Sequence, residues 1–399
     1  MSSLFESFVA TPEISEALAD RAVIEAMLRF EAALARAQAS AGLLPQATAM
    51  SIIGTCKVEL FDVPKLVRES TRTRCLATPL VASLRETVAL FNPEAVSWVH
   101  FACSDQELVD TALVLVIRDV LKRIQTDLAK TIDLLLTLAL RHEGDAMLAR
   151  SPLHAASITS FGLTCSQWVA PLVRSQQQLH SAADHALRLH LGSAVAMMAD
   201  MQGKGHQVMR LMATELQLNA PAFAGNNAHD DTVALACALG LLTGNLGKIA
   251  LEIAHMAQFE LGELTQVNTA LAAVPGAKPV PPIATTLLCM VAQVAAQRVP
   301  QQVAVLLASL SQEHGNALGN WQTQLAQWPA LLAASQSITS AVTQLVAGVQ
   351  ADTQRMRSNL DAVRTSLSAK EGKARFSNEL VQLAAELTRS QVEALRQPL

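Results

Sequence analysis

The chain has 399 residues, a formal net charge of −4, and 51% hydrophobic against only 16% charged side chains. A length of this order predicts two or three domains, and the lack of a basic stripe or arm argues against a nucleic-acid partner. So little charge is unusual for a soluble monomer, and we therefore expect a homo-oligomer whose subunit contacts cover apolar surface. The alternative is a large, apolar monomeric bundle.

The sequence gives no sign of a membrane partner or a targeting segment. No apolar run reaches about 18 residues without a polar or charged interruption, and the opening MSSLFESFVATPEI lacks the basic start and apolar run of a signal peptide. Six cysteines are scattered without paired spacing and without a zinc or redox motif. This pattern favours a cytoplasmic protein with reduced thiols and no metal site.

The first part of the chain, residues 1–111, alternates short helical patches with turns and is expected to form an N-terminal helical domain. Thr11 followed by Pro12 is typical of a helix cap with proline at the first helical position. A helix is expected over residues 17–41, and Pro64 marks the start of another. The segment from Asn92-Pro93 to residue 107 is expected to form a loop that leads into a helix.

Residues 112–350 are much more regular and predict a bundle of long helices, of which four or five, at roughly 30 residues, would each be about 45 Å in length. An apolar seam with heptad-like spacing runs through the first of them. The seam residues are Ile117, Leu121, Ile124, Leu128 and Leu135. The expected helices are 111–142, 160–190, 197–216, 232–264, 283–310 and 331–349. The expected fold class is all-α, because the chain has no βαβ alternation and no Gly-rich phosphate loop.

One long break interrupts this helical pattern, from Gln266 to Pro282. It contains four prolines and Gly276 between two long apolar helices, and proline cannot continue a helix. A break of this length is more often a functional loop than a plain connector. Residues 351–399 are more charged and predict a small, separate C-terminal helical piece.

Polar clusters at helix ends could carry chemistry. They are residues 100–107, residues 150–159, residues 226–231 and the Pro-rich loop, with Arg298 beyond it. Helix N-termini and cationic side chains favour carboxylates, so the clusters suit an anionic substrate. The alternative interpretation is helix capping. Four other histidines lie on helix patterns and are expected to be solvated or satisfied in the core: His180, His185, His190 and His206.

The chain resembles the aspartase/fumarase superfamily, and within it the 3-carboxy-cis,cis-muconate cycloisomerases, from Leu4 to about Asp361. The resemblance lies in LFESFVATPEISEALADRAVIEAMLRFEAALARAQASAGLLP, WVHFACSDQELVDTALVLVIRDVL, ALGLLTGNLGKIALEIAHMAQFELGE, SLSQEHGNALGNWQ and RMRSNLD. It covers most of the chain and implies an all-helical, three-domain subunit with domains 1–111, 112–350 and 351–399. The last domain is some tens of residues shorter than in the family.

The resemblance also implies a homotetramer with a twenty-helix bundle and active sites that each draw on three subunits. The family adds or eliminates across a carbon–carbon double bond beside a carboxylate, through an aci-carboxylate held by nearby donors. In the cycloisomerase the adding group is the substrate's own carboxylate, which closes a lactone. The implied partner is a small carboxylate substrate, from aromatic catabolism, and the family uses no metal or organic cofactor.

The signature loop departs from the family pattern Gly-Ser-Ser-x-x-Pro-x-Lys-x-Asn-Pro. Leu271 and Ala272 stand where the two serines belong, and one of those serines is thought to be the base. With a one-residue insertion Lys278 meets the family lysine, but Val280 then replaces the asparagine. A positioned base and an oxyanion donor are each worth roughly 10²–10⁴ in rate, so these losses should nearly abolish the family reaction unless another base acts.

Two histidines at motif positions are the candidate bases, His154 and His229, because histidine is the residue type whose reference pKa lies nearest neutrality. The family's Arg-Thr-x-x-Gln here ends in His154, and His229 replaces an arginine. Asp105 introduces a carboxylate where the family has a small donor. The expected substrate-binding residues are His100, Ser104, Gln106, Arg150, Ser151, Thr159, Lys278 and Arg298.

Two hypotheses remain open at this point. The chain is either a cycloisomerase or lyase with a rearranged site, or a catalytically silent relative that serves as a binding or scaffold subunit and pairs with an active paralogue. A helical bundle unrelated to the family is disfavoured by the length of the resemblance.

Overall fold

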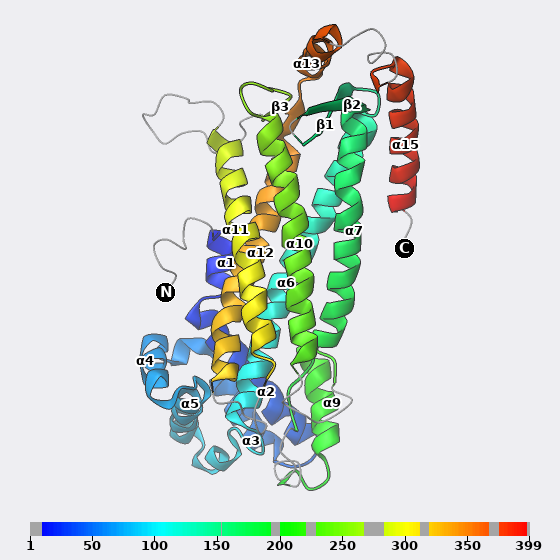
Figure 1. Ribbon diagram of the computed structural model, residues 1–399. Helices are drawn as coiled ribbons and strands as arrows, with labels where there is room; N and C mark the ends of the chain where they lie inside the picture. The colour runs from blue at the N-terminus through cyan, green and yellow to red at the C-terminus, as the bar shows by residue number, and fades with distance from the viewer. Residues whose placement is uncertain are drawn as a thin grey trace. The chain divides into compact units, whose positions relative to one another are not determined.

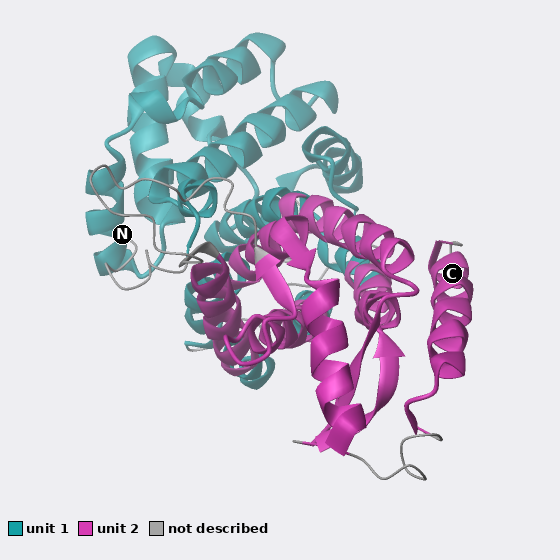
Figure 2. Ribbon diagram, turned by 90° about the horizontal axis from the view of Figure 1, so that it is seen from above, with its two compact units in different colours: residues 1–122, 180–237, 302–333 teal, residues 123–179, 238–301, 334–399 magenta. Residues whose placement is uncertain are grey.

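The structure, a computed structural model, describes residues 10–152, 154–192, 200–220, 229–266, 283–311, 319–366 and 375–396. It contains two compact units (Figure 2). Unit 1 comprises Met1–Lys122, His180–Cys237 and Gln302–Ala333, and unit 2 comprises Arg123–Leu179, Ala238–Gln301 and Ala334–Leu399. The Pro-rich loop, including Lys278, lies outside the described residues. The expected three-domain division remains a prediction.

The expected all-α class is confirmed, with a few short strands (Figure 1). The helices are α1 Pro12–Ala17, α2 Asp20–Ser40, α3 Gln46–Thr55, η2 Val58–Leu60, α4 Val63–Thr73, α5 Ala77–Phe91, η3 Pro93–Trp98, α6 Asp105–Arg141, α7 Phe161–Ala186, α9 Gly205–Leu216, α10 Asp230–Met256, α11 Ile283–Ala308, α12 Asn320–Gly348, α13 Thr353–Ser366 and α15 Asn378–Arg396. The strands are β1 Ala146–Ser151, β2 His154–Ser160, β3 Leu264–Gln266 and β4 Val349–Ala351.

Helix starts in unit 1 follow the expected capping chemistry. The Thr11 hydroxyl accepts a hydrogen bond from the Ile14 N–H at the start of α1, and the Asp62 carboxylate accepts one from the Lys65 N–H at the start of α4. Each satisfies an N–H that the first helical turn leaves without a partner. Both predicted starts are therefore confirmed.

The core of unit 1 is built around α2, which packs against α3, α4 and α9. Its apolar stripe is fully buried. The stripe residues are Ile24, Met27, Leu28, Phe30 and Leu34, each at most 1% exposed. Glu31 and Gln38 are buried in the same helix, so two polar side chains sit inside an otherwise apolar face and require internal partners.

Unit 2 holds segments of the five long helices α6, α7, α10, α11 and α12, which lie side by side (Figure 1). Polar side chains join neighbouring helices of this bundle: Thr131 and Thr343 share a hydrogen bond of 2.7 Å between α6 and α12. The Asn245 amide of α10 donates to the Ser175 hydroxyl of α7 at 3.0 Å. The expected heptad-like seam of α6 is confirmed as buried.

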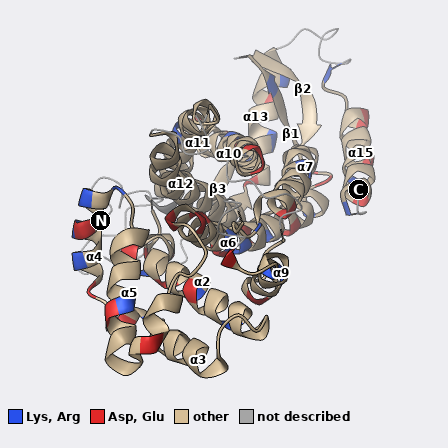
Figure 3. Cartoon of the chain, turned by 90° about the horizontal axis from the view of Figure 1, so that it is seen from below, with Lys and Arg blue, Asp and Glu red and all other residues tan. Residues whose placement is uncertain are grey.

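The bundle helices carry little charge. α12 contains no Asp, Glu, Lys or Arg, and Arg298 is the single such residue of α11; both helices are mostly tan in Figure 3. Among the described helices, α10 and α12 are long and apolar enough to cross a membrane by length and composition. In their most apolar windows, however, 61% and 72% of the residues are buried, as in the core helices of a folded domain.

Two antiparallel strand pairs differ from the expected all-loop connections: the β1–β2 hairpin, and a β3–β4 pair whose strands are far apart in the sequence. β1 pairs with β2 and β3 with β4. No strand was predicted between the expected helices 111–142 and 160–190, but Met147 and Leu148 are buried on β1 and Ile158 on β2. These strands are too short, and their Ser-Pro turn too weak a hairpin signal, for the period-2 pattern to stand out.

Gly247 marks the closest approach between α10 and α11. A Cβ atom added there would lie 2.5 Å from the Cβ of Ala296, whereas one added at Gly244, on the same helix, would meet nothing within 4 Å. The short side chain of Ala296 cannot rotate away, so the helices would have to separate.

We predict that Gly247→Ala lowers the free energy of unfolding by about 1–3 kcal/mol. Gly244→Ala is the matched control and should leave stability unchanged or raise it by up to about 1 kcal/mol, because alanine is the better helix former. Chemical denaturation of both variants measures the difference. Equal effects of the two substitutions would contradict the tight helix contact.

Candidate functional site

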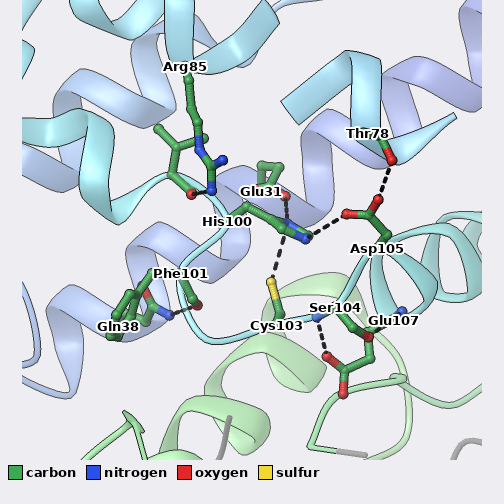
Figure 4. Close-up of polar contacts among 11 residues, drawn as sticks. Glu31, Gln38, Thr78, Arg85, His100, Phe101, Cys103, Ser104, Asp105 and Glu107 are labelled. Atoms are coloured by element: carbon green, nitrogen blue, oxygen red, sulfur yellow. Dashed lines mark hydrogen bonds and ion pairs between the residues drawn. The ribbon is translucent and has the colours of Figure 1, made fainter. Parts of the chain in front are cut away.

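The residues of the first polar cluster surround a buried ion pair in unit 1 (Figure 4). Glu31 reaches from α2 to the loop before α6, where its Oε1 lies 2.6 Å from His100 Nδ1. The Glu31 and His100 side chains are only 1% and 7% exposed. The second ring nitrogen, Nε2, faces Asp105 Oδ1 at 3.5 Å, an ion-pair distance too long for a strong hydrogen bond.

The electrostatics of this cluster keep His100 protonated. Burial alone lowers the pKa of His100, but the Glu31 carboxylate, with smaller contributions from Cys103 and Asp105, raises it well above its ordinary value. The contact with His100 in turn lowers the pKa of Asp105. His100 therefore lies as an imidazolium between two carboxylates of its own chain.

Cysteine, histidine and glutamate are the residue types of a nucleophilic triad, but their geometry here is different. Cys103 Sγ and Glu31 Oε1 both face the same ring nitrogen of His100, at 3.3 Å and 2.6 Å. In a triad the nucleophile and the carboxylate contact opposite nitrogens. Burial raises the pKa of the Cys103 thiol to about 12, which does not favour the thiolate that a nucleophilic cysteine needs.

The backbone of this loop is as constrained as its side chains. His100 and Ala102 adopt left-handed conformations, with φ of 60° and 57°, which non-glycine residues rarely occupy. Ser104 and Glu107 then form a reciprocal capping box at the start of α6, with hydrogen bonds of 3.3 and 2.8 Å. Thr78 donates to Asp105 Oδ2 at 2.5 Å. The ion pair thus fixes where α6 begins.

His229 lies at a second polar cluster of unit 1. It immediately precedes α10, is 5% exposed, and lines a cavity of about 20 Å³ together with Asp110 and His190. A cavity of this size holds about one water molecule. The Trp321 indole N–H donates to Asp110 Oδ1 at 2.7 Å, while Asp110 Oδ2 is buried with no hydrogen-bond partner within the described part of the chain.

Burial shifts both neighbours of His229 toward their neutral forms. Burial raises the pKa of Asp110 to about 7, an effect that Glu107 reinforces and that Trp321 and Gln106 oppose. Burial, with help from His229 and Arg188, lowers the pKa of His190 to about 3. Burial favours the neutral form of each group, because a charged form is costly to enclose.

The second polar cluster predicted from sequence forms the β1–β2 hairpin of unit 2. Ser151 and His154 are partners at its exposed end, and Thr159 is half-buried opposite Met147. Arg150 points to Glu263, which is fully buried, and the two form a bidentate pair at 2.9 and 2.5 Å. Asn359 of α13 donates to the same carboxylate at 2.9 Å. The Arg150 guanidinium thus satisfies an internal acid.

The structure groups the predicted site residues by unit. His100, Ser104, Gln106 and His229 belong to unit 1, and Arg150, Ser151, His154, Thr159 and Arg298 belong to unit 2. Arg298 is half-buried on α11. Sequence reasoning did not find Glu31, Asp110, His190 and Glu263. Glu31 could have been found, because it occupies a position of the apolar stripe of α2.

No group of three or more His, Cys, Asp or Glu side chains in the described ranges is arranged to hold a metal ion.

Comparison with known proteins identifies the class to which this fold and these residues belong. Residues 6–273 match the lyase family of the fumarase/aspartase superfamily, and the chain belongs to that family. It is 33% identical to the 3-carboxy-cis,cis-muconate cycloisomerase of Pseudomonas putida over 361 residues, covering 90% of this chain and 84% of that one. It is 32% identical to the enzyme of the same name from Bradyrhizobium diazoefficiens over 369 residues, covering 92% and 81%.

The fold comparison agrees. The crystal structure of the 3-carboxy-cis,cis-muconate lactonizing enzyme from Pseudomonas putida matches with a TM-score of 0.82 and 29% identity, over 99% of this chain and 88% of that chain. The resemblance to the superfamily and its cycloisomerases is therefore confirmed. The chain is a cycloisomerase- or lyase-like member of the superfamily.

We predict that Glu31→Gln destabilises the protein by about 3–5 kcal/mol at pH 6, because it leaves a buried imidazolium without its main partner. A raised histidine pKa contributes stability that is complete below the unfolded value of about 6.5 and declines as pH rises above it. The difference between wild type and variant should therefore narrow at pH 9–10. Glu59→Gln breaks an exposed pair with Arg21 and should cost at most about 1 kcal/mol.

We also predict that Asp110→Asn flattens part of the pH dependence of stability. The raised pKa of Asp110, about 7, means that its contribution declines as pH rises from about 4 through 7. Asparagine can still accept the Trp321 hydrogen bond and does not ionise. The melting temperature of Asp110→Asn, relative to that of wild type, should therefore show a gain as the pH increases from 5 to 8.5. Asp133→Asn, at an exposed position, is the control and should show no such gain.

Proposed function

We propose that this chain lactonises, or eliminates from, a small polycarboxylate of the 3-carboxy-cis,cis-muconate type, without a metal or organic cofactor. The observation that carries the proposal is the match to the lactonizing enzyme over 99% of the chain. In the lactonising direction a substrate carboxylate oxygen bonds to one alkene carbon while an acid delivers a proton to its neighbour. In the reverse direction the same protein group, as a base, removes that proton.

Of the two candidate bases, His154 is better supported than His229. His154 is exposed at the end of the β1–β2 hairpin, opposite Ser151. His229 is 5% exposed and lines a cavity of about 20 Å³, which is far too small for a polycarboxylate of six or more carbons. We therefore assign proton transfer to His154 and keep His229 as the second candidate.

The remaining residues would bind or position the substrate. Hydroxyl and amide groups of Ser104, Gln106, Ser151 and Thr159 suit its carboxylates as hydrogen-bond donors, and Lys278 and Arg298 suit them as cations. His100 and Arg150 already face internal carboxylates. We propose that these two act by positioning the loop before α6 and the hairpin.

A second candidate function is a silent binding or scaffold subunit that pairs with an active paralogue. It is favoured by Leu271, Ala272 and Val280, which supply none of the groups expected in the signature loop.

The deciding experiment is an assay of the purified protein with 3-carboxy-cis,cis-muconate, following lactone formation by NMR. We predict turnover that falls by about 10²–10⁴-fold in His154→Ala. His180→Ala, on the exposed face of α7, is the matched control and should retain full rate. If the protein neither converts nor binds this acid or fumarate-type acids, the enzymatic function is contradicted. The silent-subunit function is then the supported one.

We further propose a homotetramer in the cytoplasm. All six cysteines are free thiols, as is usual in a reducing compartment. Leu287, Met290 and Val294 form an exposed apolar stripe on α11, 37–56% exposed, next to α10. Helices α10 and α11 are neighbours, because Gln293 donates to the Gly247 carbonyl. Apolar surface of this kind marks contact sites between subunits.

We predict a mass of four chains by light scattering. The double substitution Leu287→Glu and Met290→Glu should reduce it to a dimer or monomer, because charges buried in an apolar contact are costly. Leu90→Glu, at an exposed position on α5, is the control. A wild-type monomer would overturn the proposed assembly, and the lactonisation assay tests the proposed chemistry separately.

A further inference from the structure

Unit 1 contains a pocket of about 350 Å³ that none of the described candidate site residues lines. Two helices form most of its wall. Val109, Leu113 and Val116 contribute a stripe from α6 at spacings of four and three residues, and a stripe from α12 has the same spacings. The α12 residues are Leu325, Pro329 and Leu332. The remaining lining residues are Leu18, Val23, Ser70, Thr71, Arg74, Cys75 and Leu76.

The pocket has the size and composition of a small-molecule site. Ligand pockets typically measure about 300–1,000 Å³ and combine apolar walls with a few polar groups that orient the ligand. Here the walls from α6 and α12 are aliphatic, Ser70, Thr71 and Cys75 are the uncharged polar residues, and Arg74 is the single charged residue on the lining. Leu332 is fully buried, and Val109 and Val116 are almost so, so the walls are firm parts of the core.

Arg74 is placed in an unusual way for a surface arginine. It caps the C-terminus of α4 in the left-handed conformation, with φ of 57°, where glycine or asparagine is usual. Its side chain is exposed, and no carboxylate of the described residues forms an ion pair with it. The chain therefore keeps a guanidinium at this pocket at some conformational cost.

We propose that this pocket binds a monocarboxylic acid with an aromatic or branched aliphatic body, with the carboxylate held by Arg74. A single guanidinium above aliphatic walls matches one carboxylate on an apolar body. It does not match the polycarboxylate of the proposed function, whose several charges would face aliphatic side chains. The site is therefore separate from that function and would be present in a silent subunit too.

The test uses full-length protein with two probes of nearly the same shape, 4-fluorobenzoate and the neutral 4-fluorobenzamide, and follows binding by fluorine NMR. Wild type should bind the benzoate about tenfold or more tightly than the benzamide, as expected for a charge-assisted pair. Arg74→Gly should remove this preference. It should not lower the melting temperature, because glycine is favoured at a positive φ.

Two further variants locate the site. Arg72→Gln, an exposed arginine of α4 that does not line the pocket, should keep the preference for benzoate. Val116→Phe should fill the pocket and abolish binding of both probes. The proposal is overturned if wild type binds neither probe, if it binds both equally, or if Arg74→Gly retains the preference.

Discussion

The ion pair between Glu31 and His100 is the interaction on which unit 1 depends. It joins the middle of α2 to a loop 69 residues later in the chain, and that loop holds two left-handed residues and the capping box of α6. Since α6 is 37 residues long, an error in where it begins would shift every side chain along it. A buried ion pair adds little net stability, but removing one partner is costly. Its value here lies in specifying one conformation.

A second buried carboxylate plays the same part in unit 2. The Glu263 carboxylate accepts hydrogen bonds from Arg150 of the β1–β2 hairpin and from Asn359 of α13. The Glu263 backbone N–H donates to the Met256 carbonyl at the end of α10. Two of the cationic residues that were expected to bind substrate, His100 and Arg150, thus face acids supplied by the chain itself. Ser151 and His154 remain exposed on the hairpin. These two buried pairs hold the loop before α6 and the β1–β2 hairpin in a single conformation.

The sequence was sufficient for the helices and insufficient for the polar interior. Apolar periodicity locates α2, α6, α10 and α11 because each buries a continuous stripe, and the caps at Thr11 and Asp62 are local signals. Glu31 was visible as an acid within the stripe of α2, but its partner was not, because nothing local relates it to residue 100. The same holds for Glu263, which meets Arg150 across 113 residues. His190 was expected on a helix and instead follows the end of α7, beside Asp110, a pairing that only tertiary structure creates.

The scarcity of charge on α11 and α12 has a consequence for how the protein is made. Helices α11 and α12 together have 55 residues and one arginine. Before the chain has folded, exposed helices of this composition associate with one another. Folding of unit 2 and covering of its apolar helices must therefore be nearly simultaneous. The yield of native protein should then depend on synthesis rate and chain concentration more steeply than for a charged bundle of equal length.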